Sequence, residues 1–491
     1  MTQQIAWGKA SALILCAAGI CLFYFAFSPA VIYPIDGNSM LAVAESLITR
    51  HSFAVPISGL GTIGRHGLYY SRWYPLLSII ALPPVALGIF VSHHLGLPQH
   101  YTAAIFALTL SPILAAATAL LVALLARRLG ATTRGATIAS LGYAFGTIAM
   151  VYSRDFFADP LLALLTAAGI YFSLGDDPRE AAAASAAVLL AVLAKPTGIV
   201  LGPCLGAYLL CKRRAPGRWV APLFATAAGL MIYFIYNWAR FANPFDFGQA
   251  GAFALYVVPS ALAGLLISPG RGLLWYCPAV IALVALPGAI FKRGESALLV
   301  GVAGAYLAEH SVWLFWAGGW SWGPRLLLPA LPGLMALTGL LERRWRWLLV
   351  ALSAAGFIIN SPNLVSFYER YYQEALAAKV SERAQEWSLS SAPLFQIWGA
   401  AWRETVDAYQ NADQVGAFVH QAGNAPLATS VESSRTLRIV DLWWWMLPAV
   451  GIPRAAGAAV SLALLLIGLW LITRALARAP DGDGAALAGG P

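Results

Sequence analysis

Long apolar runs recur along the whole of this 491-residue chain, and they constrain its fold more than any other feature. A helix needs about 20 consecutive apolar residues to cross a bilayer, where it must satisfy its own backbone hydrogen bonds. Hydrophobic residues make up 59% of the chain and charged residues only 11%, whereas soluble domains carry about 25% charged residues. The sequence therefore predicts an all-α integral membrane protein without a large soluble domain.

About a dozen of these runs are candidates for transmembrane helices, and several of them are short. They cover residues 10–32, 101–126, 136–152, 159–174, 181–194, 197–211, 219–239, 273–291, 296–316, 325–341, 345–360 and 441–473. The first could instead be a signal peptide, because the small residues Ser28 and Ala30 lie near its end. Its length favours a retained span.

Basic residues gather in the connections between the runs and predict the orientation of the chain. The clusters are Arg127, Arg128 and Arg134; Lys212, Arg213, Arg214 and Arg218; Lys292 and Arg293; Arg343, Arg344 and Arg346; and Arg474 and Arg478. Short cytoplasmic loops are rich in lysine and arginine, so we place these clusters and both termini in the cytoplasm. Segment 75–91, which contains Pro83 and Pro84, must then lie on or dip into the outer leaflet. No basic soluble face suggests nucleic-acid binding.

Cysteine and histidine offer no recognisable metal site. The cysteines lie in or beside apolar runs without a CxxC pair, and we interpret them as small buried hydrophobic residues. They are Cys16, Cys21, Cys204, Cys211 and Cys277. His93, His94 and His100 share one short loop without an acidic partner at a metal-binding spacing, so we interpret them as polar loop residues.

Three acids lie where the predicted outer loops meet the membrane. Asp36 follows the first span, and a partly desolvated carboxylate there could act as a general base; alternatively, it caps a helix at 38–49. Asp155 and Asp159 follow the third span. Asp159 precedes Pro160 and could cap the next helix, and Asp155 could form a surface ion pair with Arg154.

Four isolated cations stand beside helix-breaking residues near the expected membrane surface: Arg72, Lys195, Arg271 and Arg325. A cation at such a depth is costly and is usually paired or functional. If several converge on one outer cavity, they would form an anion site suited to a lipid phosphate. The alternative is that each extends to the lipid headgroups.

Aromatic residues flank the same segments. Tyr70 and Tyr74 lie on either side of Arg72, and Trp320 and Trp322 precede Arg325. Their rings could stack on a sugar, or they could belong to the aromatic belt of the membrane interface.

The order of these features resembles the GT-C superfamily of membrane glycosyltransferases, among them the protein mannosyltransferases and the lipid A aminoarabinose transferases. The resemblance rests on Asp36 after the first span, the proline-containing segment Tyr70–Pro75, an acid after the third span, and the Lys195-Pro196 break. It covers residues 1–215. An acidic pair typical of protein mannosyltransferases is absent, because Gly37 follows Asp36.

The resemblance implies a GT-C-like bundle that transfers one sugar from a polyprenyl-phosphate donor to an envelope glycan, lipid or protein. Asp36 would be the catalytic base, with Asp155 or Asp159 as a second acid. Lys195 would contact the phosphate, and Arg72 would replace the lysine of a Lys-Pro-Pro segment found in aminoarabinose-type relatives. No metal or other cofactor is inferred, because metal-binding acids of the oligosaccharyltransferase type are missing. The implied location is the bacterial inner membrane, with the site facing outward.

The expected organisation has five parts. Residues 1–215 form the catalytic transmembrane module with its first outer loop at 33–100, and residues 216–360 form a variable transmembrane module. Residues 361–440 form a small extracytoplasmic helical cap, 441–478 the final transmembrane helix, and 479–491 a disordered tail. A competing hypothesis is a transporter or flippase of a lipid-linked sugar, although transporters place ionisable residues near mid-membrane between repeats.

Overall fold

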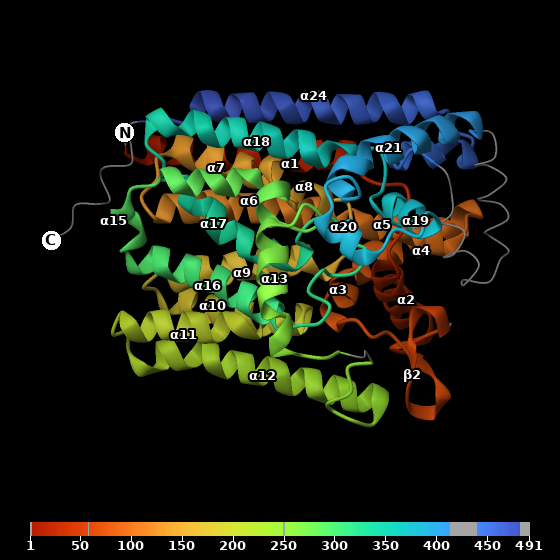
Figure 1. The fold of residues 1–491 in the computed structure, drawn as a ribbon, viewed down its shortest axis with the longest axis horizontal. Coiled ribbons are helices and arrows are strands. Elements are labelled where there is room, and N and C mark those ends of the chain that lie inside the picture. Colours follow the sequence, from red (N-terminus) through yellow and green to blue (C-terminus); the bar gives the residue numbers. More distant parts are fainter. Residues whose placement is uncertain (1, 57, 249–250, 413–438, 482–491) are drawn as a thin grey trace.

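The computed structural model describes residues 2–56, 58–248, 251–412 and 439–481, which form a predominantly helical bundle (Figure 1). Most of the long helices run side by side along the longest axis of the molecule. They are α1 (Thr2–Ala26), α6 (Leu110–Arg128), α7 (Thr133–Gly146), α9 (Ala158–Ser173), α10 (Pro178–Ala194), α11 (Leu201–Cys211), α12 (Pro216–Phe241), α16 (Gly294–Ser311), α18 (Arg346–Asn360) and α24 (Arg454–Arg478). The helical architecture expected from the apolar runs is confirmed.

The number of membrane crossings is not confirmed. Within the described residues, four helical stretches are long and apolar enough to cross a bilayer: Gln99–Arg128, Pro216–Phe241, Arg343–Leu364 and Arg454–Arg478. Apolar helices of 10–17 residues accompany them, for example Ser11–Ala26 and Ala158–Ser173. An estimate of about twelve spans counts these shorter helices as full crossings.

Prolines interrupt several of the expected spans, because a proline removes a backbone donor and clashes with the preceding turn. The run at 273–291 is divided into α14 (Leu273–Tyr276), the 3-10 helix η5 (Pro278–Ala285) and α15 (Gly288–Phe291). The run at 325–341 is divided into η6 (Arg325–Ala330) and α17 (Leu331–Thr338), and the last run contains η9 (Trp443–Val450) before α24 begins.

The basic clusters meet at one end of the bundle, where α1 begins and α24 ends (Figure 1). Arg346 and Arg134 contact Asp481, Arg293 donates to the Leu129 carbonyl, and Lys212 pairs with Glu295 at 2.6 Å. The expectation that these clusters share one side agrees with this arrangement.

The opposite end carries the first-loop and cap elements (Figure 1). The first loop contains α2 (Ile35–Arg50), α3 (Pro75–Ile80), α4 (Leu82–Leu95) and a small antiparallel sheet of order β1-β3-β2, in which Tyr70 pairs with Ala54 and Thr62. Its strands are β1 (Ala54–Val55), β2 (Thr62–Ile63) and β3 (Tyr69–Tyr70), and α5 (Gln99–Leu108) follows α4. The break expected near Pro83 and Pro84 lies between α3 and α4.

The cap contains the helices α19 (Glu369–Ala377), α20 (Glu382–Trp387) and α21 (Pro393–Gln410). Helices are therefore present where the sequence predicts a helical cap. Residues 413–438 of that region, and residues 482–491 of the tail expected to be disordered, lie outside the described residues. Another helix, α13 (Val258–Ile267), lies between α12 and α14 in the chain.

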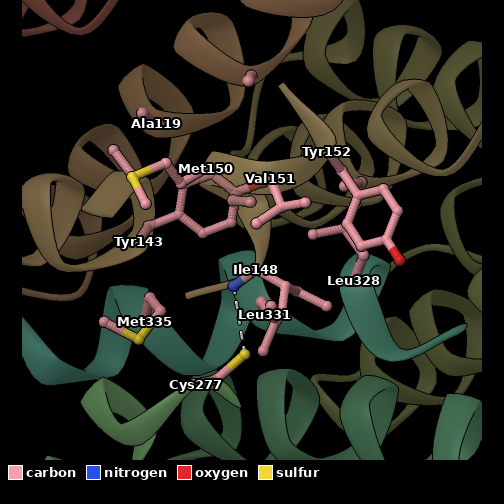
Figure 2. Packing of buried hydrophobic residues seen from close by; sticks show 14 of the residues in the cluster. Ala119, Tyr143, Ile148, Met150, Val151, Tyr152, Cys277, Leu328, Leu331 and Met335 are labelled. Carbon is pink, nitrogen blue, oxygen red and sulfur yellow. Dashed lines mark hydrogen bonds between the residues drawn. The ribbon is translucent and has the colours of Figure 1, made fainter. Parts of the chain in front are cut away.

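Aromatic, aliphatic and sulfur side chains fill the interior of the bundle (Figure 2). Tyr143 lies beside Met150 and Val151, and the backbone N–H of Ile148 contacts Cys277 Sγ at 3.5 Å. All five cysteines are free. Cys16 and Cys277 are buried as expected, whereas Cys211 is exposed at the end of α11.

Helices α1 and α24 join the two ends of the chain through a glycine contact. A Cβ atom placed on Gly19 would lie 2.6 Å from the Gly468 carbonyl oxygen, and one on Gly468 would lie 2.8 Å from the Gly19 carbonyl oxygen. Small residues allow transmembrane helices to approach this closely.

We therefore expect Gly468→Leu to force α1 and α24 apart and to lower the thermal stability of the purified protein, at a cost of about 1–3 kcal/mol for overpacking. Gly301→Leu on α16 is the matched control, because a Cβ there meets no atom within 4 Å. Equal melting temperatures for the two variants would contradict a tight α1–α24 contact.

Candidate active site

Four charged side chains from distant parts of the sequence form one continuous row. Arg325 Nη1 donates to Asp36 Oδ2 at 3.3 Å, and Arg325 Nε lies 4.0 Å from Asp159 Oδ2. Lys195 Nζ donates to the other Asp159 oxygen at 2.6 Å. The signs alternate along the row, so each charge lies beside one of opposite sign.

Helix ends position these residues. Asp36 lies in the first turn of α2 and Asp159 in the first turn of α9, where the helix dipole favours negative charge. Lys195 follows the last residue of α10, where the dipole favours a cation. Its backbone is extended, as expected for a residue before a proline.

The acids do not cap these helices. Pro34 is the residue before α2, and Phe157 is the residue before α9, so each helix begins before the acid that was expected to cap it. The capping interpretation is therefore wrong for both acids, and their carboxylates are directed to the cations instead.

Gly37 allows the start of α2 to approach the loop before α9. A Cβ on Gly37 would lie 2.7 Å from Ile32 Cγ2 and 2.9 Å from the Phe156 carbonyl oxygen. Because real Cβ atoms do not approach other atoms this closely, glycine is required for Asp36 and Asp159 to come together.

Arg325 follows a glycine-rich loop whose turns require left-handed backbone. Gly318, Gly319 and Gly323 have φ angles of 76°, 69° and 57°, which glycine adopts without a steric cost. Arg271 holds this loop from outside the charged row. Its guanidinium donates to the carbonyls of Gly319, at 2.6 Å, and Ser321.

The row is mostly shielded from water, and Asp36 is its most accessible member. The exposed fractions of the side chains are 22% for Asp36, 11% for Arg325, 11% for Lys195 and 5% for Asp159. Burial raises the pKa of the Asp36 carboxyl, and the neighbouring Arg325 opposes that rise. Arg325 also lies over the Phe157 ring, with Cζ 4.6 Å from its centroid.

The other residues suggested by the sequence have different contacts. Arg72 lies over Trp73 with Cζ 5.9 Å from the ring centroid. Tyr70 packs edge-on against Phe241 beside the small sheet. Tyr74 lies 5.9 Å from Tyr233, measured between ring centroids.

Tyr74 is the aromatic candidate with an electrostatic link to the row. Burial raises its pKa well above the usual value, and Tyr233, Asp159 and Asp36 add to the effect. The phenol therefore keeps its proton and can donate a hydrogen bond.

The two tryptophans of the glycine-rich loop differ. Trp320 is half-buried and stacks on Tyr372, with centroids 5.8 Å apart. Trp322 is fully buried, and its Nε1 donates to Asn360 Oδ1 at 2.6 Å. Its ring therefore has no exposed face for a sugar in this conformation.

Asp155 lies in a second charged cluster that fastens the cap to the bundle. Its carboxylate accepts a hydrogen bond from Tyr368 at 2.9 Å, and burial raises its pKa well above the usual value. The neighbouring Arg154 pairs with Asp441 at 2.9 Å, and their side chains are 3% and 0% exposed. The alternative of a surface pair between Arg154 and Asp155 is therefore wrong.

Tyr368 and Asp441 were not predicted from the sequence to belong to a charged cluster. Asp441 receives the backbone N–H of Ala30 as well as Arg154, so it joins the end of α1 to the segment before α24. The sequence around Asp441 does not indicate this role, because the partners of Asp441 lie hundreds of residues away in the chain. Among the residues described by the structure, no group of three or more His, Cys, Asp or Glu side chains is arranged to hold a metal ion.

We expect Arg154→Leu to destabilise the protein strongly, because it leaves the buried Asp441 carboxylate without its cation at a cost of about 3–5 kcal/mol. Thermal unfolding followed by the fluorescence of the tryptophans would measure the loss. The control is Arg403→Leu, whose pair with Glu374 is 56% and 33% exposed and should contribute about 0–1 kcal/mol. Similar melting temperatures for both variants would contradict a stabilising role of the buried pair between Arg154 and Asp441.

No protein-family model and no curated protein sequence matches the chain. Several solved structures do. ArnT from Cupriavidus metallidurans in the apo state matches with a TM-score of 0.47 and 16% identity, over 94% of this chain and 77% of that one. The Archaeoglobus fulgidus oligosaccharyltransferase matches with a TM-score of 0.44 and 11% identity, over 77% and 59%. Arabinosyltransferase EmbB from Mycobacterium smegmatis matches with a TM-score of 0.39 and 14% identity, over 95% and 42%. These similarities are too distant to assign an activity to this chain.

Proposed function

We propose that the protein is a GT-C-type membrane glycosyltransferase that moves one sugar from a polyprenyl-phosphate carrier to a cell-envelope acceptor. The observation that carries the proposal is the row Asp36–Arg325–Asp159–Lys195. It combines one accessible carboxylate with two cations that are held by a second carboxylate. A base beside an anion site is what transfer from a phosphate leaving group requires.

The cations suit the phosphate of the donor. Lys195 can donate three hydrogen bonds and is oriented by Asp159. Arg325 Nε is buried and makes no hydrogen bond within the described residues. A phosphate oxygen placed between Lys195 and Arg325 would accept these unused hydrogens as negative charge develops on the leaving group.

Asp36 is suited to activate the acceptor. Its carboxylate would take the hydroxyl proton of the acceptor as that oxygen forms a bond to the anomeric carbon. The bond from the anomeric carbon to the phosphate oxygen breaks, and its electron pair leaves with the polyprenyl phosphate. One displacement from the opposite face inverts the anomeric centre. Tyr74 and Trp320 are the candidates for contacts with the sugar or acceptor.

The proposed location is the bacterial inner membrane with the site facing outward. The basic clusters lie at the end of the bundle where α1 begins and α24 ends, and α2 lies at the other end (Figure 1). Since basic loops face the cytoplasm, Asp36 would open to the outside. The bilayer, the lipid-linked donor and the envelope acceptor are the partners this arrangement requires.

The competing function is a transporter or flippase of a lipid-linked sugar. Such a protein would use the same cations to hold the phosphate and would not need a base. The position of the row at helix ends near one face of the bundle favours the enzyme, because transporter sites lie near mid-membrane.

We expect Asp36→Asn to reduce turnover about 10²–10⁴-fold, the usual contribution of a general base, while donor binding persists. The assay would follow radiolabelled polyprenyl-phosphate sugars with membrane extract as the acceptor. Asp246→Asn is the matched control, because Asp246 is exposed in an outer-end loop. Full activity in Asp36→Asn would contradict the proposed base. Binding without transfer by the wild type would favour the flippase.

The activity should fall on the acid side, because Asp36 acts only when ionised. Burial raises the pKa of Asp36, so the pH at which activity falls on the acid side should lie above the ordinary Asp pKa of about 3.9. Arg325 lowers the pKa of Asp36, so Arg325→Gln should move the acid limb of kcat/KM to higher pH and also raise KM. Arg403→Gln should leave the limb in place. An unchanged acid limb in Arg325→Gln would contradict the electrostatic link.

A further inference from the structure

A buried hydrogen-bonded network lies behind Asp36 and is not used by the proposed chemistry. Asn38 and Glu45 of α2 both contact His100 of α5. His100 Nε2 lies 3.0 Å from Asn38 Oδ1, and His100 Nδ1 lies 2.8 Å from Glu45 Oε2. Gln99 Nε2 contacts the other Glu45 oxygen at 3.4 Å. The side chains of His100 and Glu45 are 11% and 8% exposed.

The backbone around Asp36 fixes the orientation of the Asn38 amide. Asn38 Nδ2 donates to the carbonyl of Ile32 at 2.7 Å and to that of Pro34 at 3.1 Å. Because carbonyls can only accept, the nitrogen of the amide must face them and Oδ1 must face His100. Asn38 therefore holds the chain immediately before Asp36, and His100 in turn holds Asn38.

The same donor and acceptor rules fix the hydrogens of His100. Asn38 Oδ1 is an acceptor, so Nε2 must carry a hydrogen. Nδ1 faces a carboxylate oxygen, and two lone pairs at 2.8 Å would repel. One proton must therefore lie between Nδ1 and Oε2, either on the imidazole or on the carboxyl.

We infer that His100 is a positioning residue for Asp36, and that the proton it shares with Glu45 keeps the start of α2 in its active arrangement. The inference rests on the proposed function, because it assigns Asp36 the role of base. His100 does not touch the reacting atoms. It acts through Asn38 and the Ile32 and Pro34 carbonyls.

Loss of the shared proton should disrupt this support. The neutral imidazole would then have one hydrogen for two acceptors, so either Glu45 Oε2 or Asn38 Oδ1 would lose its donor and the contact between α2 and α5 would weaken. Other titratable groups on α2 and on the elements packed against it are Asp36, Arg50, His93, His94 and Tyr101. His93 and His94 are exposed, and Arg50 donates to Ser46 Oγ and the Ala54 carbonyl. Glu45 is the acid in contact with His100.

The substitution Glu45→Gln isolates the shared proton. The amide nitrogen of the new side chain can donate to Nδ1 of a neutral His100 while Nε2–H still donates to Asn38, and the amide oxygen can accept from Gln99. The network is then satisfied without a proton to lose. His100→Ala, in contrast, leaves the buried Asn38 oxygen without a donor at every pH.

The test combines the kinetics of transfer with nitrogen-15 NMR of histidine-labelled full-length protein in lipid nanodiscs. The His100 signal is identified by its absence in His100→Gln, and His93→Gln is the control variant. We expect Glu45→Gln to keep kcat near the wild-type value, and His100→Ala to lower kcat roughly tenfold to a hundredfold with a smaller change in KM. We expect Nε2 of wild-type His100 to be protonated at neutral pH.

A His100 ring with a bare Nε2 would overturn the inference, as would an unchanged kcat in His100→Ala. The NMR measurement on the wild type does not depend on turnover, and it does not depend on whether the His100→Ala variant folds. If no sugar is transferred by the wild type, the proposed function fails. The NMR result then still decides whether His100 holds Asn38 as inferred.

Discussion

Alternating charge at helix ends is the constraint on which the site depends. A cation or carboxylate buried near a membrane surface is costly alone, and the cost falls when opposite charges meet with good geometry. Asp159 stands at the centre of this balance, because it binds Lys195 directly and lies beside Arg325. Asp36 pairs with Arg325 and remains partly open to solvent. The row is thus a set of mostly buried ion pairs in which Asp36 is the most accessible residue.

The same balance explains how the row could receive a substrate. A phosphate can bind through the hydrogens of Lys195 and Arg325 that are not used in the row, and its negative charge would then compete with Asp159 and Asp36 for the two cations. Competition for Arg325 would leave Asp36 with less of its cation, which raises its basicity at the moment when a base is needed. In the second charged cluster, Arg154 and Asp441 are both buried. This cluster holds the cap on the bundle.

The members of the row could be chosen from the sequence, but their partners could not. Lys195 before Pro196 and Asp36 after the first apolar run were visible because breaks and charges are rare in apolar segments. Arg271 and Arg325 both follow glycine- and proline-rich breaks in the sequence. Only the tertiary structure shows that Arg271 supports the loop and that Arg325 pairs with the acids. Trp320 and Trp322 were likewise indistinguishable, although one is half-buried and the other is in the core.

The fold was predictable at the level of helices and of the clustering of basic residues at one end. The exact spans were not, because prolines divide several apolar runs into short helices. His100 was interpreted as an ordinary loop residue because its partners, Asn38 and Glu45, lie more than fifty positions earlier.

The measurement that tests the central claim most directly is a cryo-electron microscopy structure of the protein in a nanodisc with a non-hydrolysable polyprenyl-phosphate sugar. The account predicts phosphate density between Lys195 Nζ and Arg325 Nε, with Asp36 facing the anomeric carbon on the side away from the phosphate. A phosphate bound at the end that carries the basic clusters, or a sugar out of reach of Asp36, would contradict it.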